Sequence, residues 1–495
     1  MAVVQKPVEM FDRDAEWRAL SDFVSDPRPG ATLGVISGRR RQGKTFLLDS
    51  VTREFGGFYF GATEALDAES LRRFGDEFTR FADLAVPARF DDWFEVFDAL
   101  LSLGERAPVP VVIDEFPYLA QARSELPSII QNAYGPRRPE RTRSHTRLLL
   151  CGSAMSFMGG LLSGSAPLRG RAGLEMVVHP LDFRLAAEFW GITDPRLAIQ
   201  VHAVVGGTLA YRDEFLRGDR PADVADFDDW VRRTALNPQT PLFREGRYLL
   251  SEEMSVRDPA IYSAVLSAIA EGDATRGGIA GKLNRKSGDL AHPLDVLEDA
   301  RLIARDRDMF RKNRSTYRIA DPYLAFYQAV MRPVWGQLER PNSAERVWEA
   351  SRRTFKSKIV GPHFEQVCRD WTLDHADLSY FGGELPAMVG QGIVNDVEQR
   401  TSHEVDVAVV GVANDGKPAL LAIGEAKWND VMGRGHLERL ERLRSVIAKG
   451  GQYDTGPTRL LCFSGAGFNE YLMQQSAVRD DLSLVGLDDL YGVDD

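Results

Sequence analysis

One short segment constrains this chain more than any other. The octapeptide GRRRQGKT, residues 38–45, fits the pattern G-x-x-x-x-G-K-[ST] and stands between an apolar run and the helix-like segment 46–55. Two glycines let such a loop curl so that its N–H groups face an anion, and the following helix adds the partial positive charge of its N-terminus. The segment therefore predicts a strand–loop–helix unit that binds phosphate.

Each part of this loop has an expected role toward a bound nucleotide. Gly38 and Gly43 give the backbone its curvature, and Lys44 is expected to reach the β- and γ-phosphates of ATP. Thr45 is expected to ligate Mg²⁺. ATP and Mg²⁺ are thus the cofactors that the loop predicts.

Two further apolar runs end in polar residues that suit the same site. VVIDE (111–115) predicts Asp114 as a holder of the magnesium and its water shell, and Glu115 as the catalytic carboxylate that polarises the attacking water. LLLCGS (148–153) ends in Ser153, placed where a sensor of the γ-phosphate would lie, although an ordinary helix N-cap serine is the alternative.

In the loop 167–173, Arg169 and Arg171 could reach a phosphate in the same chain or across a subunit interface, because a guanidinium matches phosphate oxygens; solvated loop arginines are the alternative.

The runs 32–38, 109–115 and 147–153 are continuously apolar, as in strands buried on both faces of a parallel sheet. Amphipathic segments separate them, so residues 1–180 predict an α/β fold, and the helical signal over 180–235 predicts a lid.

Together with MFDRDAEWRAL (10–20) and VVGGTLAYR (204–212), these motifs resemble the archaeal-type ATPase family, a STAND/AAA+-related group. The resemblance covers about residues 8–235 and implies an AAA+-like sheet. The resemblance implies a phosphate-contacting role for Arg171 but not for Arg169. Since AAA+ relatives often form rings and STAND relatives often stay monomeric until triggered, a homo-oligomer is one expectation.

The middle of the chain is basic although the whole chain carries a net charge of −11. Residues 275–318 hold eleven Lys/Arg and six Asp/Glu, and they predict a helix-turn-helix followed by a two-stranded wing with arms 302–308 and 315–321. In the turn of the wing, Arg311, Lys312 and Arg314 suit the phosphates of nucleic acid. The alternative is a winged helix that serves only as a packing or lid element. The polar stretch 336–346 predicts a linker.

The last third contains four residues that we call the carboxylate–lysine centre: Glu365, Asp406, Glu425 and Lys427. The runs 403–410 and 420–430 predict a hairpin, joined by the turn 413–418, that brings Asp406 beside Glu425 and Lys427. Alternate side chains of a strand share a face, so Glu425 and Lys427 point the same way. Carboxylates suit Mg²⁺, Lys427 could orient or activate a water, and Glu365 on the helical segment 361–371 could complete the metal site.

This spacing, D-x(18)-E-x-K, resembles the PD-(D/E)XK nuclease superfamily over about residues 350–495, with the leading proline absent. The resemblance implies an α/β restriction-endonuclease-like fold and a catalytic, metal-binding role for Asp406, Glu425 and Glu365, with Lys427 assisting. A surface ladder of salt bridges and a nuclease fold that has lost its activity are the alternatives.

Composition excludes several classes. No apolar run approaches the ~18–20 residues that span a bilayer, and the N-terminus lacks the pattern of a signal peptide. Three scattered cysteines (151, 368 and 462) exclude a disulfide scaffold, so a cytoplasmic location is expected. An acidic chain is no general nucleic-acid coat, so contact with DNA must come from local basic patches.

The sequence thus predicts a P-loop ATPase with a helical lid (1–235), a winged helix-turn-helix (240–335) and a nuclease-like domain (347–495). The leading hypothesis is an ATP-regulated, Mg²⁺-dependent DNA nuclease in defence or repair, with no membrane association. One alternative is a STAND-like signalling ATPase whose C-terminal domain binds a partner or DNA without cutting. Another is a DNA-binding transcription regulator gated by ATP.

Overall fold

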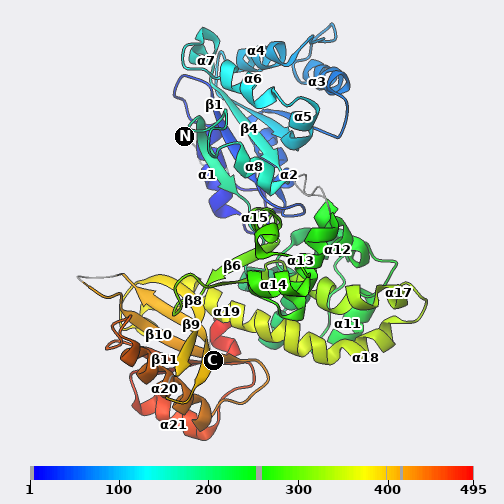
Figure 1. Cartoon of the computed structure of the whole chain (residues 1–495). Coiled ribbons are helices and arrows are strands. Elements are labelled where there is room, and N and C mark those ends of the chain that lie inside the picture. The colour runs from blue at the N-terminus through cyan, green and yellow to red at the C-terminus, as the bar shows by residue number, and fades with distance from the viewer. Residues whose placement is uncertain (1–4, 252–258, 397, 413–415, 494–495) are drawn as a thin grey trace.

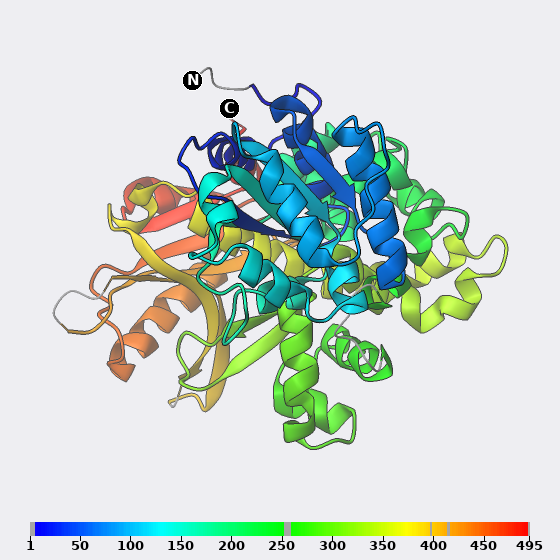
Figure 2. The same cartoon turned by 90° about the horizontal axis from the view of Figure 1, so that it is seen from above.

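The computed structural model describes residues 5–251, 259–396, 398–412 and 416–493. An N-terminal lobe, a helical middle part and a C-terminal lobe are visible in Figure 1, and the view from above shows the N-terminal lobe lying over the other two (Figure 2). Among the described residues, no helix is both long and apolar enough to cross a bilayer.

The N-terminal lobe alternates strands and helices along the chain. Its elements are α1 (Asp14–Val24), β1 (Thr32–Ser37), α2 (Lys44–Phe55), β2 (Phe58–Gly61), α3 (Asp67–Phe81), α4 (Trp93–Leu103), β3 (Val109–Asp114), α5 (Phe116–Ala122), α6 (Leu126–Ala133), α7 (Pro139–Arg143), β4 (Thr146–Gly152), α8 (Met155–Gly160) and β5 (Ala172–Val177).

These strands form a five-stranded parallel sheet in the order β2-β3-β4-β1-β5. Two hydrophobic clusters cover it. One packs Val111, Ile113 and Leu148 against α3–α6, and the other packs Ile36 and Leu149 against α1 and α2. Burial on both faces explains why the strands are continuously apolar. The predicted α/β fold of this lobe is confirmed, and the loop GRRRQGKT follows β1 at the carboxyl edge of the sheet, where the phosphate-binding loop of a P-loop fold lies.

Helices dominate the middle of the chain. Its elements are α9 (Phe183–Trp190), α10 (Pro195–Val205), η1 (Tyr211–Phe215), α11 (Phe227–Arg233), α12 (Pro241–Ser251), α13 (Pro259–Glu271), α14 (Arg276–Lys282), η2 (Ser287–Leu290), α15 (Ala291–Asp299), β6 (Ile303–Arg307), β7 (Ser315–Ile319), α16 (Pro322–Phe326), η3 (Tyr327–Met331), η4 (Arg332–Val334), α17 (Trp335–Leu338), α18 (Ala344–Thr354) and η5 (Phe355–Val360).

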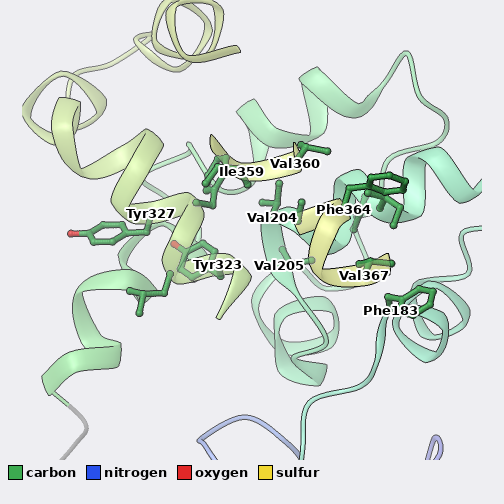
Figure 3. Packing of buried hydrophobic residues seen from close by; sticks show 14 of the residues in the cluster. Phe183, Val204, Val205, Tyr323, Tyr327, Ile359, Val360, Phe364 and Val367 are labelled. Atoms are coloured by element: carbon green, nitrogen blue, oxygen red, sulfur yellow. The ribbon is translucent and has the colours of Figure 1, made fainter. Parts of the chain in front are cut away.

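One hydrophobic cluster runs from Leu181 in the lid to Leu490 near the C-terminus. Figure 3 shows Val204 and Val205 of α10 beside Ile359, Val360 and Phe364 of the later helices. The predicted boundaries near 240 and 347 therefore do not separate hydrophobic cores, and the division into three domains stays a prediction.

Two predicted features of the middle part have different outcomes. The strands β6 and β7 pair antiparallel, as expected for the arms of a wing. The linker predicted at 336–346 is wrong in part, because α17 ends and α18 begins inside it. Leu338 is fully buried in the large cluster and Trp335 packs on Phe243 with ring centroids 4.5 Å apart, so tertiary packing orders a segment whose composition is polar.

The C-terminal lobe contains the second sheet, in the order β12-β11-β10-β9-β8. Strands β8 to β10 pair antiparallel and β10 to β12 pair parallel. The elements are α19 (Gly361–Asp374), η6 (Leu378–Phe381), β8 (Pro386–Asp396), β9 (Thr401–Gly411), β10 (Leu420–Lys427), α20 (Arg434–Gly450), β11 (Arg459–Ser464), α21 (Glu470–Val478), β12 (Leu482–Val485) and α22 (Leu487–Tyr491).

Helices cover both faces of this sheet. Phe364 and Val367 of α19 pack on the face of Val407 and Phe463, whereas α20 and α21 pack on the opposite face. The predicted hairpin is confirmed by the antiparallel pairing of β9 with β10, although residues 413–415 of its predicted turn lie outside the described residues. The lobe is an α/β layer structure; its identification as a nuclease fold stays a prediction.

Candidate functional site

The loop after β1 has the backbone that an anion site needs. Gly38 has φ +158° and a Cβ there would lie 2.6 Å from the carbonyl oxygen of Val178; Gly43 has φ +82° and immediately precedes α2. No side chain caps that helix, so its first N–H groups face the loop. Lys44 is buried, which lowers its pKa, and its Nζ donates to the carbonyl of Arg39 at 2.8 Å.

The other predicted nucleotide-site residues converge on this loop. Thr45 Oγ1 donates to Asp114 Oδ2 at 2.8 Å, and Tyr59 donates its hydroxyl to the same oxygen at 2.6 Å. Ser153 Oγ donates to Glu115 Oε2 at 3.0 Å. The carboxyl ends of β3, β4 and β1 lie along one edge of the parallel sheet, and this brings the four predicted residues Thr45, Asp114, Glu115 and Ser153 together.

Arg171 is not brought to this site. It precedes β5, which runs parallel to β1 with Ala172 opposite Leu33, so it lies at the amino edge of the sheet. The phosphate loop begins after Ser37, and its first residue lies about 17 Å from Leu33 along β1 at ~3.3 Å per residue. Contact of Arg171 with a nucleotide in its own chain is therefore wrong, and contact across a subunit interface stays a prediction.

The variable positions of the loop reach into the middle part of the chain. Arg39 forms an ion pair with Asp321 at 2.7 Å, Arg41 pairs with Glu245 at 2.9 Å, and Gln42 donates to Thr208 at 3.1 Å. Asp321 lies between β7 and α16, and its Oδ1 caps α16 by accepting from the N–H of Leu324. The sequence indicated these positions only as a basic run, because their partners lie 166 to 282 residues away.

A cavity of about 840 Å³ connects the phosphate loop with the C-terminal lobe. Its lining includes Arg39 and Asp321 at one part and His363 and Gln366 of α19 at another. His202 of α10 also lines it, and its Nδ1 lies 2.9 Å from Nε2 of His363. The two imidazoles thus join the lid to the helix that carries Glu365, a contact that no sequence signal indicated.

This histidine pair predicts a dependence of stability on pH. Burial lowers the pKa of His202 from 6.5 to about 4, and the carboxylates of Asp182 and Asp321 counteract it only in part. Burial and the neighbouring His202 also lower the pKa of His363. The unfolded chain binds the proton at a higher pH than the folded chain does. The free energy of unfolding should therefore have its full value above about pH 6.5 and decrease as the pH falls toward 4.

For His202, the loss amounts to at most about 3 kcal/mol. The measurement is urea unfolding of the wild type and of His202→Gln at several pH values, with the exposed His292→Gln as the control. The His202→Gln variant should lose part of the acid-side slope and His292→Gln should keep it. Equal slopes in all three proteins would contradict the prediction.

The carboxylate–lysine centre lies where β9 and β10 run side by side. Between Val405 and Ala408, β9 takes three steps while β8 takes two, from Gly392 to Gly390, so β9 has a bulge around Asp406. A bulge turns a side chain away from the regular alternation of a strand. The Oδ2 atom of Asp406 accepts hydrogen bonds from the N–H of Ala426 at 2.9 Å and from Lys427 Nζ at 3.3 Å.

Lys427 bridges two carboxylates, since its Nζ also lies 3.1 Å from Glu425 Oε1. Burial works against its charge, but Asp406 and Glu425 together raise the pKa of Lys427. Glu425 and Asp406 are each about 5% exposed. The hairpin therefore holds a buried cluster of charges, as the spacing of the three residues predicted.

Glu365 faces the same cluster from α19. Burial first and then the charge of Asp406 raise the pKa of Glu365 to about 8. One helical turn later, the buried Arg369 donates from Nη1 to the carbonyl of Asp406 at 2.8 Å. Sequence reasoning missed Arg369, although its position four residues after Glu365 places both on one face of the helix.

A second arginine that the sequence did not single out enters the centre from α20. Arg439 forms an ion pair with Glu425 Oε1 and donates to the carbonyl of Glu404 at 2.9 Å. In the described ranges, no group of three or more His, Cys, Asp or Glu residues is positioned to hold a metal ion. The predicted metal set of Glu365, Asp406 and Glu425 is therefore not assembled in this arrangement, because lysine and arginine draw the carboxylates toward themselves.

The basic turn of the wing docks on the C-terminal sheet. We call residues 308–314 the wing tip. Met309 donates its N–H to the carbonyl of Gln391 in β8 at 3.0 Å, and Tyr453 donates to the carbonyl of Met309. Arg311 donates hydrogen bonds to Asn395 and, at 3.3 Å, to Ser402 Oγ. The contact of Arg311, Lys312 and Arg314 with the phosphates of nucleic acid stays a prediction. Lys312 is exposed, and Arg314 lies 3.9 Å from Asp308.

Comparisons with known proteins give relatives but no family, and no family model matches the chain. It is similar to an uncharacterized protein of Methanocaldococcus jannaschii, 24% identical over 431 residues that make up 86% of this chain and 88% of that protein.

Among solved structures, it is similar to a Walker-type ATPase of Pyrococcus abyssi, with 22% identity over 65% of this chain and 96% of that chain and a TM-score of 0.48. It is also similar to the ORC2 protein of Aeropyrum pernix in ADPNP and ADP complexes, with 14% identity over 70% and 97% of the two chains and a TM-score of 0.44. What the chain does must be inferred from its own residues.

Proposed function

We propose that this protein is an ATP-hydrolysing P-loop protein that acts as an ATP-regulated, Mg²⁺-dependent DNA nuclease. The observation that carries the nuclease half is the bridging of Asp406 and Glu425 by Lys427, at 3.3 and 3.1 Å, with Glu365 facing the same cluster. Two carboxylates and a lysine on adjoining strands, with a third carboxylate on a helix, match what metal-assisted phosphodiester hydrolysis requires.

In the nucleotide site, the chain's own groups have clear tasks. Lys44 donates to a carbonyl of its own loop at 2.8 Å, so a triphosphate offers it a charged partner in place of a neutral one. Thr45 and Asp114, already in contact at 2.8 Å, would hold the magnesium ion that accompanies ATP. Glu115, positioned by Ser153, would orient the attacking water.

The carboxylate chemistry of the carboxylate–lysine centre suits a hard divalent cation, and such an ion would draw the carboxylates away from their ion pairs with Lys427 and Arg439. Glu425 Oε2 is buried and has no hydrogen-bond partner among the described residues, and carboxylate oxygens are the ligands that Mg²⁺ prefers. Asp406, Glu425 and Glu365 would hold the ion, which would supply Lewis-acid stabilisation of the phosphate when bound. Lys427 would orient the attacking water, and Arg439 would leave Glu425 and turn toward the substrate phosphate.

Contacts of the phosphate loop support regulation by ATP. Arg39 is paired with Asp321 at the start of α16, and the cavity beside that pair is also lined by α19, the helix of Glu365. Phosphates that attract Arg39 would weaken its pairing with Asp321. The Arg39–Asp321 pair and the helix of Glu365 thus border one cavity, and the coupling between the two sites is a free energy to be measured.

Asp321→Asn tests this coupling. Asparagine keeps the cap on α16 but removes the charge that pairs with Arg39. We expect the ratio of DNA cleavage rates with and without ATP to fall toward one while ATP binding persists, and the free energy of unfolding to fall by about 1–3 kcal/mol. The exposed Asp295→Asn in α15 is the control. An unchanged ratio in Asp321→Asn would remove this pair from the coupling.

One observation favours a second candidate function. Glu425 is already neutralised by Lys427 and Arg439, and such ion pairs suit a structural role. The second candidate is therefore a STAND-like regulatory ATPase whose C-terminal lobe binds a partner or DNA without cutting.

Incubation of the full-length protein with linear, circular and single-stranded DNA decides between the two. The reactions contain Mg²⁺ or Mn²⁺, with and without ATP, and the products are separated on gels. Cleavage that requires the divalent cation and changes with ATP supports the nuclease. ATP hydrolysis without cleavage of any substrate would favour the regulatory ATPase.

A further inference from the structure

The wing tip carries positive charge that its surroundings do not neutralise. Arg311 contacts the neutral side chains of Asn395 and Ser402, and within the described part of the chain neither it nor Lys312 has an ion-pair partner. Arg314 has only the distant Asp308 at 3.9 Å. The tip therefore holds three cations against the single anion Asp308, with Lys312 exposed and Arg314 half-buried, at a fixed position on the C-terminal sheet.

This position lies beside the carboxylate–lysine centre. Ser402 and Glu404 share one face of β9, because they are two residues apart in a regular stretch of the pairing with β8. Glu404 borders the centre, since its carbonyl accepts a hydrogen bond from Arg439, which also pairs with Glu425. Along the strand, Ser402 and Asp406 are about 13 Å apart at ~3.3 Å per residue.

Contacts with the C-terminal lobe fix the position of the wing tip relative to the carboxylate–lysine centre. Asp308 Oδ1 accepts from the N–H of Ile393 at 3.2 Å, and a Cβ at Gly392 would lie 2.6 Å from the same oxygen, so the tip sits directly against the backbone of β8. Phe310 packs on Tyr453 with ring centroids 5.9 Å apart. A wing held in this way cannot scan DNA independently of the C-terminal lobe.

We propose that the wing tip and the carboxylate–lysine centre form one binding tract for duplex DNA. The cations of the tip hold backbone phosphates that flank the phosphate placed at the centre. The proposal rests on the proposed nuclease function, and it makes the wing a part of the substrate tract of the C-terminal lobe, not a separate reader of DNA sequence.

Binding is measured first, by fluorescence anisotropy of a labelled duplex with the full-length protein in Ca²⁺ and ATP. The variants are Lys312→Gln and the double variant Lys312→Gln/Arg314→Gln. The control is Lys417→Gln, because Lys417 is exposed in the connection between β9 and β10, at the opposite end of β9 from Ser402. We expect each lost cation to weaken binding about 3- to 10-fold and to reduce the salt slope by about one, with no change for Lys417→Gln.

Cross-linking then tests whether both parts contact one DNA tract. The three native cysteines are buried, so Lys312→Cys gives a single accessible thiol for a photo-cross-linker. Ser402, which holds the neighbouring Arg311, lies about 13 Å along β9 from Asp406, a length of about four base pairs at ~3.4 Å per pair. The cross-linked nucleotide should therefore lie within a few base pairs of the nucleotide at which Mg²⁺ induces cleavage.

The outcomes separate the two proposals. If the wild type cuts DNA but the wing-tip variants bind like Lys417→Gln, the inference is overturned while the proposed function stands. If the wild type binds DNA without cutting and the wing-tip variants bind more weakly, the nuclease proposal fails and the tip remains a DNA surface, whose cross-link is then compared with one from Arg439→Cys at the centre. Cross-links far from the cut, or from the Arg439→Cys cross-link, would overturn the single tract.

Discussion

Replacing Lys427 with methionine should lower the rate of DNA cleavage by about 10²- to 10⁴-fold, the usual contribution of a group that assists proton transfer. Methionine keeps an unbranched side chain but cannot hold a water by hydrogen bonds. Lys427 is the cation within 3.3 Å of both Asp406 and Glu425, so its loss also removes the bridge between them. The measurement is the single-turnover cleavage rate in saturating Mg²⁺.

Three controls accompany this variant. ATP hydrolysis should stay at the wild-type rate, because the phosphate loop lies in a different lobe. Thermal unfolding checks the fold, which Glu425 helps to maintain through its remaining ion pair with Arg439. Lys417→Met, on the same hairpin, should cut normally. A Lys427→Met protein that cuts at the wild-type rate would show that the cleaving site lies elsewhere.

Replacing Lys44 with alanine should reduce ATP hydrolysis by about 10²-fold or more, as the loss of a positioned donor to a developing charge commonly does. Lys44 is buried behind the loop, where burial already lowers its pKa, so its ammonium gains strongly from a phosphate partner. The measurement is phosphate release under saturating ATP, together with the affinity for a fluorescent ATP analogue.

Arg53→Ala is the matched control, since Arg53 is a mostly exposed cation at the far end of the same helix. It should hydrolyse ATP like the wild type. The same Lys44→Ala protein also tests regulation, because its DNA cleavage should no longer respond to ATP. Retained ATP hydrolysis in Lys44→Ala would contradict the assignment of the phosphate loop.

Much of this arrangement follows from contiguous sequence. The loop GRRRQGKT requires the conformations of Gly38 and Gly43, and apolar runs that end in Asp114 and Ser153 place those residues at one edge of a parallel sheet. The hairpin that joins Asp406 to Glu425 and Lys427 is also local in sequence. Local propensity and strand alternation suffice for such features, because the contacts that decide them lie within one strand–loop–helix unit or one hairpin.

Contacts between distant segments were decided only by the tertiary structure. Arg171 lies at the far edge of the sheet because β5 runs parallel to β1, and the wing tip is bound because β8 receives it. The pairing of Arg39 with Asp321 and of His202 with His363 joins residues 282 and 161 positions apart. The candidate residues of each site could be predicted from the sequence alone, since their residue types and spacing are local. The tertiary structure alone decided which neighbours neutralise, orient or connect these groups, because side-chain packing and ion pairing between lobes depend on where the whole chain places them.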